Sequence, residues 1–174
     1  IKKKIKFVKA DITDLKSLKD KYFKKVDVIF HLAALADIVP SINNPKKYFD
    51  TNVNGTLNIL EKCKKNQVKK LIYAASSSCY GLPKKLPINE NAKIDTRYPY
   101  ALSKYLGECL VLHWSKVYKM NNVSLRLFNA YGPRSRTNSN YGAMFGVFLT
   151  QKLKNKQLTI VGNGKQTRDF LFIS

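Results

Sequence analysis

The residue types best suited to catalysis lie in the segment Tyr98–Lys104 and in the serine cluster Ser76–Ser78 that precedes it. Tyr100 and Lys104 are four positions apart, so on a helix their side chains lie on one face. A phenol held beside an ammonium group has a lowered pKa and can act as a base near neutral pH. The spacing therefore predicts a tyrosine and lysine pair that handles protons, with serine hydroxyls nearby.

The spacing alone is not specific, because the chain is rich in both residue types. It contains ten tyrosines, and lysines make up most of its 32 basic residues. A second match, Tyr80–Lys84, contains Gly81 and Pro83, so we expect a turn there instead of a shared helix face. The stretch Tyr100–Tyr118 has apolar residues at the spacing of an amphipathic helix. The context therefore selects Tyr100.

Length and composition indicate one globular domain or part of one. The chain has 174 residues, 44% of them hydrophobic. It begins at Ile1 and ends at Ser174 directly after an apolar run, so we expect both ends to be cut. No apolar run is long enough to span a bilayer, and Ile1–Val8 is too charged for the core of a signal peptide. The three cysteines are widely spaced and show no metal-ligand pattern, which predicts a reduced, cytoplasmic protein without a metal site.

The formal net charge of +21 raises the possibility of a nucleic-acid partner. Only five of the basic residues are arginines, and the lysines are spread over nearly every expected helix and turn. A nucleic-acid surface usually concentrates arginines and interleaved aromatic residues. We therefore interpret the charge as a solvated surface and expect neither a nucleic-acid partner nor a membrane partner.

Apolar segments typical of strands alternate with segments of helical periodicity. The expected strands are Lys6–Ala10, Val26–Leu32, Val68–Ala75, Val123–Phe128, Leu158–Val161 and Phe170–Ile173. The expected helices are Leu15–Phe23, Lys46–Lys65, Tyr100–Tyr118 and Ala143–Leu153, with loops around Pro40 and Pro45, over Gly81–Tyr98 and over Arg134–Tyr141. This alternation predicts a doubly wound α/β fold, with a parallel sheet covered on both faces.

Polar motifs follow four of the expected strands. They are Asp11, His31–Ala34, Ser76–Ser78 and Asn129. Ligands of such sheets bind at the carboxyl ends of the strands, so we expect these motifs to meet in one site.

Seven sequence blocks in order carry a resemblance to a known family. They are Ala10–Ile12, His31–Ala34, Thr51–Thr56, Ala75–Gly81, Tyr98–Lys104, Leu125–Pro133 and Gly162–Phe170. In these blocks the chain resembles the extended short-chain dehydrogenase/reductase superfamily, specifically NAD-dependent epimerase/dehydratases such as the UDP-glucose and UDP-N-acetylglucosamine 4-epimerases. The resemblance covers essentially the whole chain and implies a Rossmann-like fold.

The resemblance also implies a set of NAD-binding residues. They are Asp11 and Ile12 at the adenine, Leu32, Ala33 and Ala34 at a strand end, Thr51, Asn52, Tyr100, Lys104 and Phe128. Other interpretations remain open at some positions. Asp11 could cap a strand end, Ala33 and Ala34 could pack in the core, and the polar pair at 51 and 52 could be ordinary residues near a helix start.

For catalysis, the resemblance implies that Tyr100 is the base and that Lys104 binds the nicotinamide ribose and lowers the pKa of the tyrosine. Ser76 would hydrogen-bond the reacting hydroxyl, although a turn-forming serine cluster is the alternative. Asn129 and Arg168 would contact the substrate, with the guanidinium group on the diphosphate. The segment Thr159–Val161 would lie beside the uracil, or would be a simple edge strand.

The implied function is a nucleotide-sugar 4-epimerase that interconverts UDP-hexoses through a transient 4-keto intermediate with bound NAD. In sugar 4,6-dehydratases an Asp and a Glu follow the catalytic Thr, whereas this chain has Ser77 and Ser78 there. The serine pair favours an epimerase. Another NAD(P)-dependent dehydratase or reductase of nucleotide sugars, and a non-catalytic NAD-binding relative, remain alternatives.

The chain lacks a glycine-rich dinucleotide fingerprint, which in the family lies in the first strand-helix unit. We therefore expect residues 1–174 to be a partial NAD-binding domain without the first βαβ unit and most of the C-terminal substrate lobe. The substrate-binding region would start at about residue 129. We expect this fragment alone to bind NAD poorly and to be inactive, and the full-length protein to be a homodimer formed through helices Lys46–Lys65 and Tyr100–Tyr118.

Overall fold

A three-stranded parallel sheet forms the centre of the fold. The computed structural model describes residues 5–83, 85–134, 144–160 and 162–173. The strands β1 (Val28–His31), β2 (Lys70–Ala74) and β3 (Val123–Leu125) pair in the order β1-β2-β3. In the register, Phe30 lies opposite Ile72, which in turn lies opposite Val123. The expected strands at Val26–Leu32, Val68–Ala75 and Val123–Phe128 are therefore present, each shorter than predicted.

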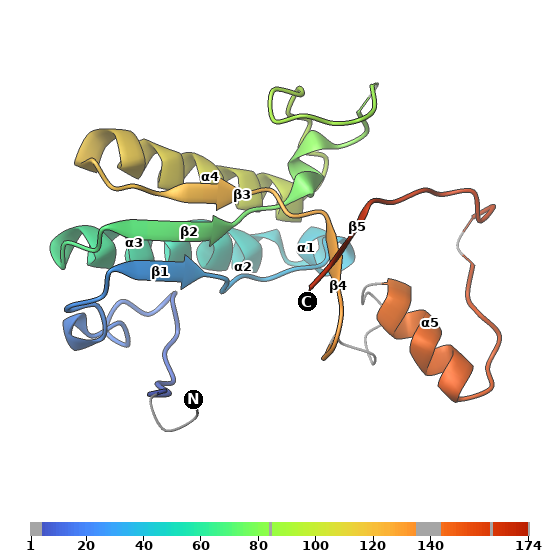
Figure 1. Ribbon diagram of the computed structural model, residues 1–174, viewed down its shortest axis with the longest axis horizontal. Coiled ribbons are helices and arrows are strands. Elements are labelled where there is room, and N and C mark those ends of the chain that lie inside the picture. The colour runs from blue at the N-terminus through green and yellow to red at the C-terminus, as the bar shows by residue number, and fades with distance from the viewer. Residues whose placement is uncertain (1–4, 84, 135–143, 161, 174) are drawn as a thin grey trace.

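Two long helices, α3 (Gly55–Lys65) and α4 (Pro99–Tyr118), lie along one face of this sheet (Figure 1). The helix predicted over Tyr100–Tyr118 is confirmed almost to the residue. Pro99 occupies the first turn, where a missing N–H costs no hydrogen bond, and Lys119 ends the helix with a left-handed conformation (φ 53°). The catalytic candidates on α4 therefore lie on a long, well-bounded helix.

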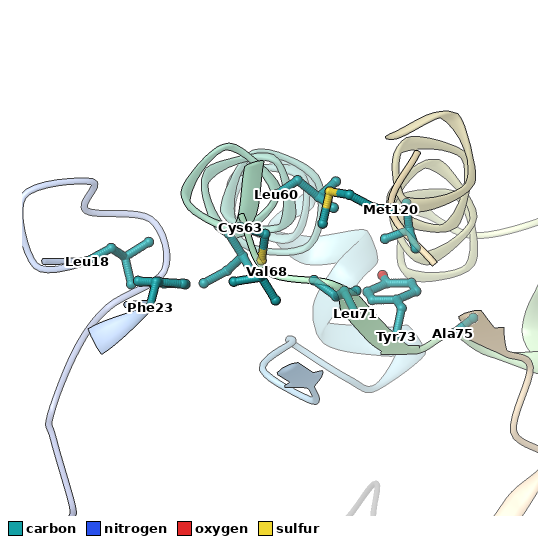
Figure 2. Packing of buried hydrophobic residues seen from close by; sticks show 11 residues of the cluster. Leu18, Phe23, Leu60, Cys63, Val68, Leu71, Tyr73, Ala75 and Met120 are labelled. Carbon is teal, nitrogen blue, oxygen red and sulfur yellow. The ribbon is translucent and has the colours of Figure 1, made fainter. Parts of the chain in front are cut away.

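The hydrophobic core lies between these helices and the sheet. Figure 2 shows Leu71 and Tyr73 pointing from β2 toward the helices, where they meet Leu60 and Cys63 of α3. All four side chains are buried. Alternate residues of a strand point to opposite faces, so the helix-facing positions of β2 are fixed by this packing.

The opposite face of the sheet is apolar and solvent-exposed among the described residues. Phe30 is 66% exposed, and Val28 and Leu125 are also exposed. The described helices α3 and α4 lie on the same face, so the two-sided covering typical of a doubly wound sheet is seen on one side only.

The N-terminal region differs most from the sequence prediction. Residues Lys6–Ala10 form no strand, and Leu15–Phe23 contains only a short 3-10 turn, Asp20–Tyr22. A strand needs a hydrogen-bonded neighbour, and the described chain places none beside the first of these segments. Leu18 and Phe23 are nevertheless buried at the edge of the core (Figure 2).

The predicted helix Lys46–Lys65 is present but not uniform. It consists of α2 (Pro45–Phe49), a π-helical turn over Asp50–Asn54, and α3. Within this turn the Gly55 N–H donates to the Asp50 carbonyl, five residues earlier.

A further helix, α1 (Ile38–Asn43), was not predicted, because Pro40 is typical of a loop. Proline is nevertheless tolerated in a first helical turn.

A second, two-stranded parallel sheet pairs β4 (Asn129–Tyr131) with β5 (Phe170–Phe172). It lies beyond the carboxyl ends of β1–β3, and α5 (Met144–Leu153) stands beside it (Figure 1). Stacking of Tyr131 on Phe145, with ring centroids 4.4 Å apart, joins this helix to β4. The β5 prediction is confirmed, whereas residues 158–160 form no strand. Predictions that fall on Lys84, on residues 135–143 and on Val161 lie outside the described residues.

Among the described residues, no helix is both long and apolar enough to cross a membrane. The same part of the chain contains no cluster of three or more His, Cys, Asp or Glu side chains arranged to hold a metal ion.

Candidate active site

Two hydroxyl groups meet just beyond the carboxyl end of β2. Ser76 caps the 3-10 turn Ser77–Tyr80, and its Oγ accepts a hydrogen bond from the Ser78 backbone N–H at 3.2 Å. Tyr100 is in the first turn of α4, and its phenol donates to Ser76 Oγ at 3.4 Å. The fold therefore brings together the serine and the tyrosine that sequence spacing singled out.

The environment of Tyr100 keeps its phenol protonated in the protein alone. Burial raises the pKa of Tyr100, the hydrogen bond with Ser76 opposes this, and the negative charge of Asp37 raises it further. The sequence predicted a pKa lowered by Lys104. The difference arises because burial outweighs the other effects and because the Lys104 ammonium group lies against another aromatic ring.

That ring belongs to Tyr73 of β2. Lys104 is buried (4% exposed), and its Nζ lies 4.3 Å from the centroid of the Tyr73 ring. Burial lowers the pKa of Lys104 to about 8. A buried ammonium group at the carboxyl end of a parallel sheet is unusual, because removing a charge from water is costly, and such groups are often functional.

Asn52 supports this site from the π-helical turn. Its side chain accepts from the Leu35 N–H at 2.8 Å, and its Nδ2 donates to the Leu35 carbonyl and to Ser103 Oγ at 3.0 and 2.9 Å. Ser103 in turn donates to the Tyr100 carbonyl at 2.9 Å. Asn52 thus ties the loop after β1 to the start of α4.

A second buried chain of hydrogen bonds runs beneath Asn52. The Thr56 hydroxyl donates to the Asn52 carbonyl at 2.7 Å and lies 2.9 Å from His31 Nε2. The Thr56 hydroxyl has one hydrogen, and it is used on the Asn52 carbonyl. We therefore assign the hydrogen between Thr56 and His31 to His31 Nε2, which donates to the Thr56 oxygen. Burial, with the nearby charge of Lys104, lowers the pKa of His31 to about 4, so the imidazole is neutral near pH 7.

A cleft of about 590 Å³ opens beside α2 and the π-helical turn. Its lining residues are Asp11, Thr13, Leu35, Lys47, Asp50, Thr51 and Asn54. Two residues predicted to bind NAD, Asp11 and Thr51, therefore share one cleft. Carboxylate, hydroxyl, amide and ammonium groups together suit a polar ligand that both donates and accepts hydrogen bonds.

The Asp11 carboxylate is already ordered. It accepts hydrogen bonds from the N–H and the hydroxyl of Thr13, both at 2.8 Å, and these lower its pKa. The neighbouring Ile12 packs on the core, and its carbonyl accepts from Asn58 at 2.9 Å. Gly55 provides the space, because a Cβ there would lie 2.7 Å from the Ile12 side chain. Ile12 therefore anchors the segment to α3.

Other predicted cofactor residues line the exposed end of the sheet. Leu32, Ala33 and Ala34 are exposed directly after β1, and Phe128 is half-buried after β3. The Ser77 N–H donates to the Leu127 carbonyl at 3.1 Å, so this part of the chain runs alongside the serine cluster.

The predicted substrate residues are on or near the small sheet. Asn129 donates to the Asp169 carbonyl at 2.8 Å, and Arg168 is exposed with its guanidinium group on the Thr167 carbonyl. Thr159 is exposed and bonds with Gln151 of α5. None of these described side chains has a hydrogen bond to Ser76 or Tyr100, so the structure does not join them to the hydroxyl pair.

Several supporting roles were not predicted. Ser78 and Ser103 lie inside the predicted motifs, but the sequence does not indicate that Ser78 Oγ lies 2.8 Å from Ser76 Oγ or that Ser103 bonds with Asn52. Glu108 is buried four residues after Lys104, a spacing that would have placed it on the same helix face. The role of Tyr73 beside Lys104 could not be predicted, because an aromatic residue in an apolar strand indicates only a core position.

The chain matches the NAD dependent epimerase/dehydratase family over residues 1–174. A putative UDP-glucose 4-epimerase of Methanocaldococcus jannaschii is 40% identical over 175 aligned residues, covering 99% of this chain and 57% of that protein. The UDP-N-acetylglucosamine 4-epimerase of Methanobrevibacter ruminantium, solved with UDP-N-acetylmuramic acid, gives a TM-score of 0.87 at 35% identity, covering 91% of this chain and 52% of that one.

The UDP-glucose 4-epimerase of Thermotoga maritima, solved with UDP-glucose, gives a TM-score of 0.92 at 28% identity and covers 99% of this chain and 56% of that one. This superposition confirms the predicted Rossmann-like α/β fold class. The chain spans about half the length of each of these proteins. Because the family match extends over the whole chain and solved relatives share its fold, the chain belongs to the NAD dependent epimerase/dehydratase family.

Proposed function

We propose that the protein containing this chain is a nucleotide-sugar 4-epimerase that interconverts UDP-hexoses with bound NAD. The observation that supports it most strongly is the hydrogen bond between Tyr100 and Ser76, residues 24 positions apart that meet at the carboxyl end of β2. Proteins named as epimerases of UDP sugars are among the relatives and solved structures that this chain resembles.

The residues present suit NAD. Asp11 and Thr51 would hold the adenosine end in the cleft, where the Asp11 carboxylate is preoriented by Thr13. The exposed small side chains of Ala33 and Ala34 let a ligand approach the backbone at the end of β1. When bound, NAD supplies the group that accepts a hydride from the sugar carbon and returns it.

The chain's own residues would handle the proton. Ser76 Oγ would accept or donate a hydrogen bond at the sugar 4-hydroxyl group and so fix its direction toward Tyr100. Tyr100 would remove the hydroxyl proton as a 4-keto sugar forms, and would return it to the same oxygen after the sugar has turned over. Burial holds the pKa of Tyr100 high. The phenol would therefore need a positive charge nearby to act as a base, and Lys104, whose ammonium group lies against the Tyr73 ring in the protein alone, would supply it in the complex.

The substrate diphosphate would be bound at the small sheet. Arg168 is exposed there, and a guanidinium fork matches phosphate oxygens. Asn129 begins β4 of this sheet, and Phe128 connects it to Leu127, whose carbonyl accepts a hydrogen bond from the Ser77 N–H. Water elimination is disfavoured, because Ser77 and Ser78 offer hydroxyl groups where a dehydratase needs carboxyl groups.

The test uses the longest reading frame that encodes this chain, incubated with NAD and separately with UDP-glucose and UDP-N-acetylglucosamine. Proton NMR follows the products. We expect the 4-epimer to appear with one of these sugars, and Tyr100→Phe to reduce the rate by at least about 10²-fold, because a general base contributes 10²–10⁴-fold. Tyr98→Phe, which removes an exposed phenol two residues earlier, is the matched control and should stay active. An unchanged rate in Tyr100→Phe, or no epimer with either sugar, would contradict the proposal.

A further inference from the structure

The Lys104 ammonium group has an unusual partner. Among the described residues, no carboxylate or hydrogen-bond acceptor contacts Lys104 Nζ, and the face of the Tyr73 ring lies 4.3 Å from it. An aromatic face attracts a cation through its quadrupole, and the attraction is strongest where water is excluded. Both side chains are buried, so this contact is the favourable interaction that offsets the cost of burying the charge.

The Tyr73 ring is itself held on several sides. Its hydroxyl donates to the Lys104 carbonyl at 3.4 Å, and its ring centroid lies 5.5 Å from that of His31. Gly107 leaves the space for the hydroxyl, because a Cβ at that position would collide with Tyr73 Oη and approach the Asn52 carbonyl at 3.0 Å. The ring therefore has one position, and that position sets where the ammonium group rests.

We propose that Tyr73 is a positioning residue whose ring face holds the Lys104 ammonium group where it binds NAD. This rests on the proposed function for the identity of the ligand. The neutral Thr56 and Asn52 face the same region from α3 and the π-helical turn. The titratable groups around the pair are His31 from β1 and Tyr100 and Glu108 from α4. Asp37, in the loop before α1, acts on Tyr100.

The test separates the ring face from the hydroxyl group and from general packing. Tyr73→Phe keeps the face, Tyr73→Leu removes it, and Leu71→Ala is the control, because Leu71 is equally buried on the same side of β2. In the full reading frame labelled with ¹³C-lysine, NMR follows the Lys104 Cε signal with pH. The signal is identified by its absence in Lys104→Met and by its titration below the other lysines.

We expect the titration midpoint of Lys104 to fall by about one pH unit in Tyr73→Leu, and to stay unchanged in Tyr73→Phe and Leu71→Ala. The dissociation constant for NAD should rise about tenfold in Tyr73→Leu only. If Tyr73→Leu does not fold, as judged by circular dichroism, Tyr73→Met replaces it at similar side-chain length.

Equal midpoints in the wild type and in a folded variant without the ring would overturn the proposal, as would a Leu71→Ala variant that shifts as much. The NMR titration needs no substrate. If the wild type shows no epimerase activity, the proposed function fails while the effect of Tyr73 on Lys104 is still decided.

Discussion

Two basic side chains of the site, His31 and Lys104, are buried next to each other, and each has a pKa below its ordinary value. Burial disfavours the charged form of both. His31 responds by staying neutral and bonding with Thr56, whereas Lys104 keeps its charge near pH 7 against the Tyr73 ring. Both shifts have the same sign, but the His31 shift affects stability in acid, whereas the Lys104 shift already lowers stability at pH 7.

For His31, the folded pKa of about 4 lies below the ordinary value of 6.5. Between these pH values His31 is protonated in the unfolded chain and neutral in the folded chain. The free energy of unfolding therefore has its full value above pH 6.5 and decreases as the pH falls toward 4. We expect the free energy of unfolding to drop by roughly 3 kcal/mol across this window. Urea unfolding at several pH values measures it, and His31→Gln should remove most of the slope; an equal slope in that variant would contradict the assignment.

For Lys104, the charged form is buried near pH 7, and its folded pKa of about 8 lies below the ordinary 10.5. Replacing it with methionine removes that cost. We expect Lys104→Met to raise the free energy of unfolding by about 2 kcal/mol at pH 7, and to abolish epimerase activity. Lys116→Met, on the exposed part of α4, is the control and should change neither quantity. A destabilised Lys104→Met variant would show that the charge stabilises the fold.

At the scale of elements, α4 is fastened to β3 and to the loop after β2 by one buried ion pair. The Arg126 Nη2 lies 2.6 Å from Glu108 Oε1, and its Nη1 donates to the Tyr80 hydroxyl at 2.7 Å. The Glu108 side chain is only 4% exposed. The pair therefore fixes the helix that carries Tyr100 relative to the turn that carries Ser76.

We expect Glu108→Ala to lower the free energy of unfolding by about 3 kcal/mol, because it leaves the guanidinium group of Arg126 poorly paired. The double replacement Glu108→Leu with Arg126→Leu should recover most of that loss, since no charge then remains unpaired. Chemical unfolding of both variants and the wild type provides the measurement. A double variant less stable than Glu108→Ala would show that the pair itself is the larger contribution.

The elements best predicted from sequence are those whose partners are local. The α4 prediction needed only a helical repeat, and Ser76 and Tyr100 were singled out by motifs that the fold then brought together. The predicted strand at Lys6–Ala10 was wrong, because a segment becomes a strand only when a neighbouring strand elsewhere in the chain pairs with it. The contact of Tyr73 with Lys104 could not be predicted either, because it depends on how β2 and α4 pack.

At the scale of the whole molecule, a highly charged surface coexists with an exposed apolar sheet face. The formal net charge is +21, and Val28, Phe30 and Leu125 are exposed on the side of the sheet away from α3 and α4. Contiguous apolar patches promote association, whereas net charge opposes it. The predicted homodimer, formed through the helices on the other side, stays a prediction.

We expect the isolated 174-residue chain to associate through this face more strongly as salt screens the charge. Phe30→Lys should reduce the association without changing the core, because Phe30 is 66% exposed. Sedimentation velocity at low and high salt measures it, with Leu112→Lys on the exposed side of α4 as the control. Association that weakens in Leu112→Lys but not in Phe30→Lys would place the contact on the helices.

The π-helical turn Asp50–Asn54 has a consequence for insertions and deletions. A π-turn holds one residue more than a regular helical turn. Deleting Val53 would restore an ordinary α-helix and would leave α2 and α3 in nearly the same rotation, because the extra residue is accommodated within the turn itself. Tyr48 should then stay buried, but Asn52 lies inside the turn and would point away from Leu35 and Ser103. The extra residue therefore serves the direction of Asn52, and relatives that keep the site should keep the chain length of this segment, even where its residues change.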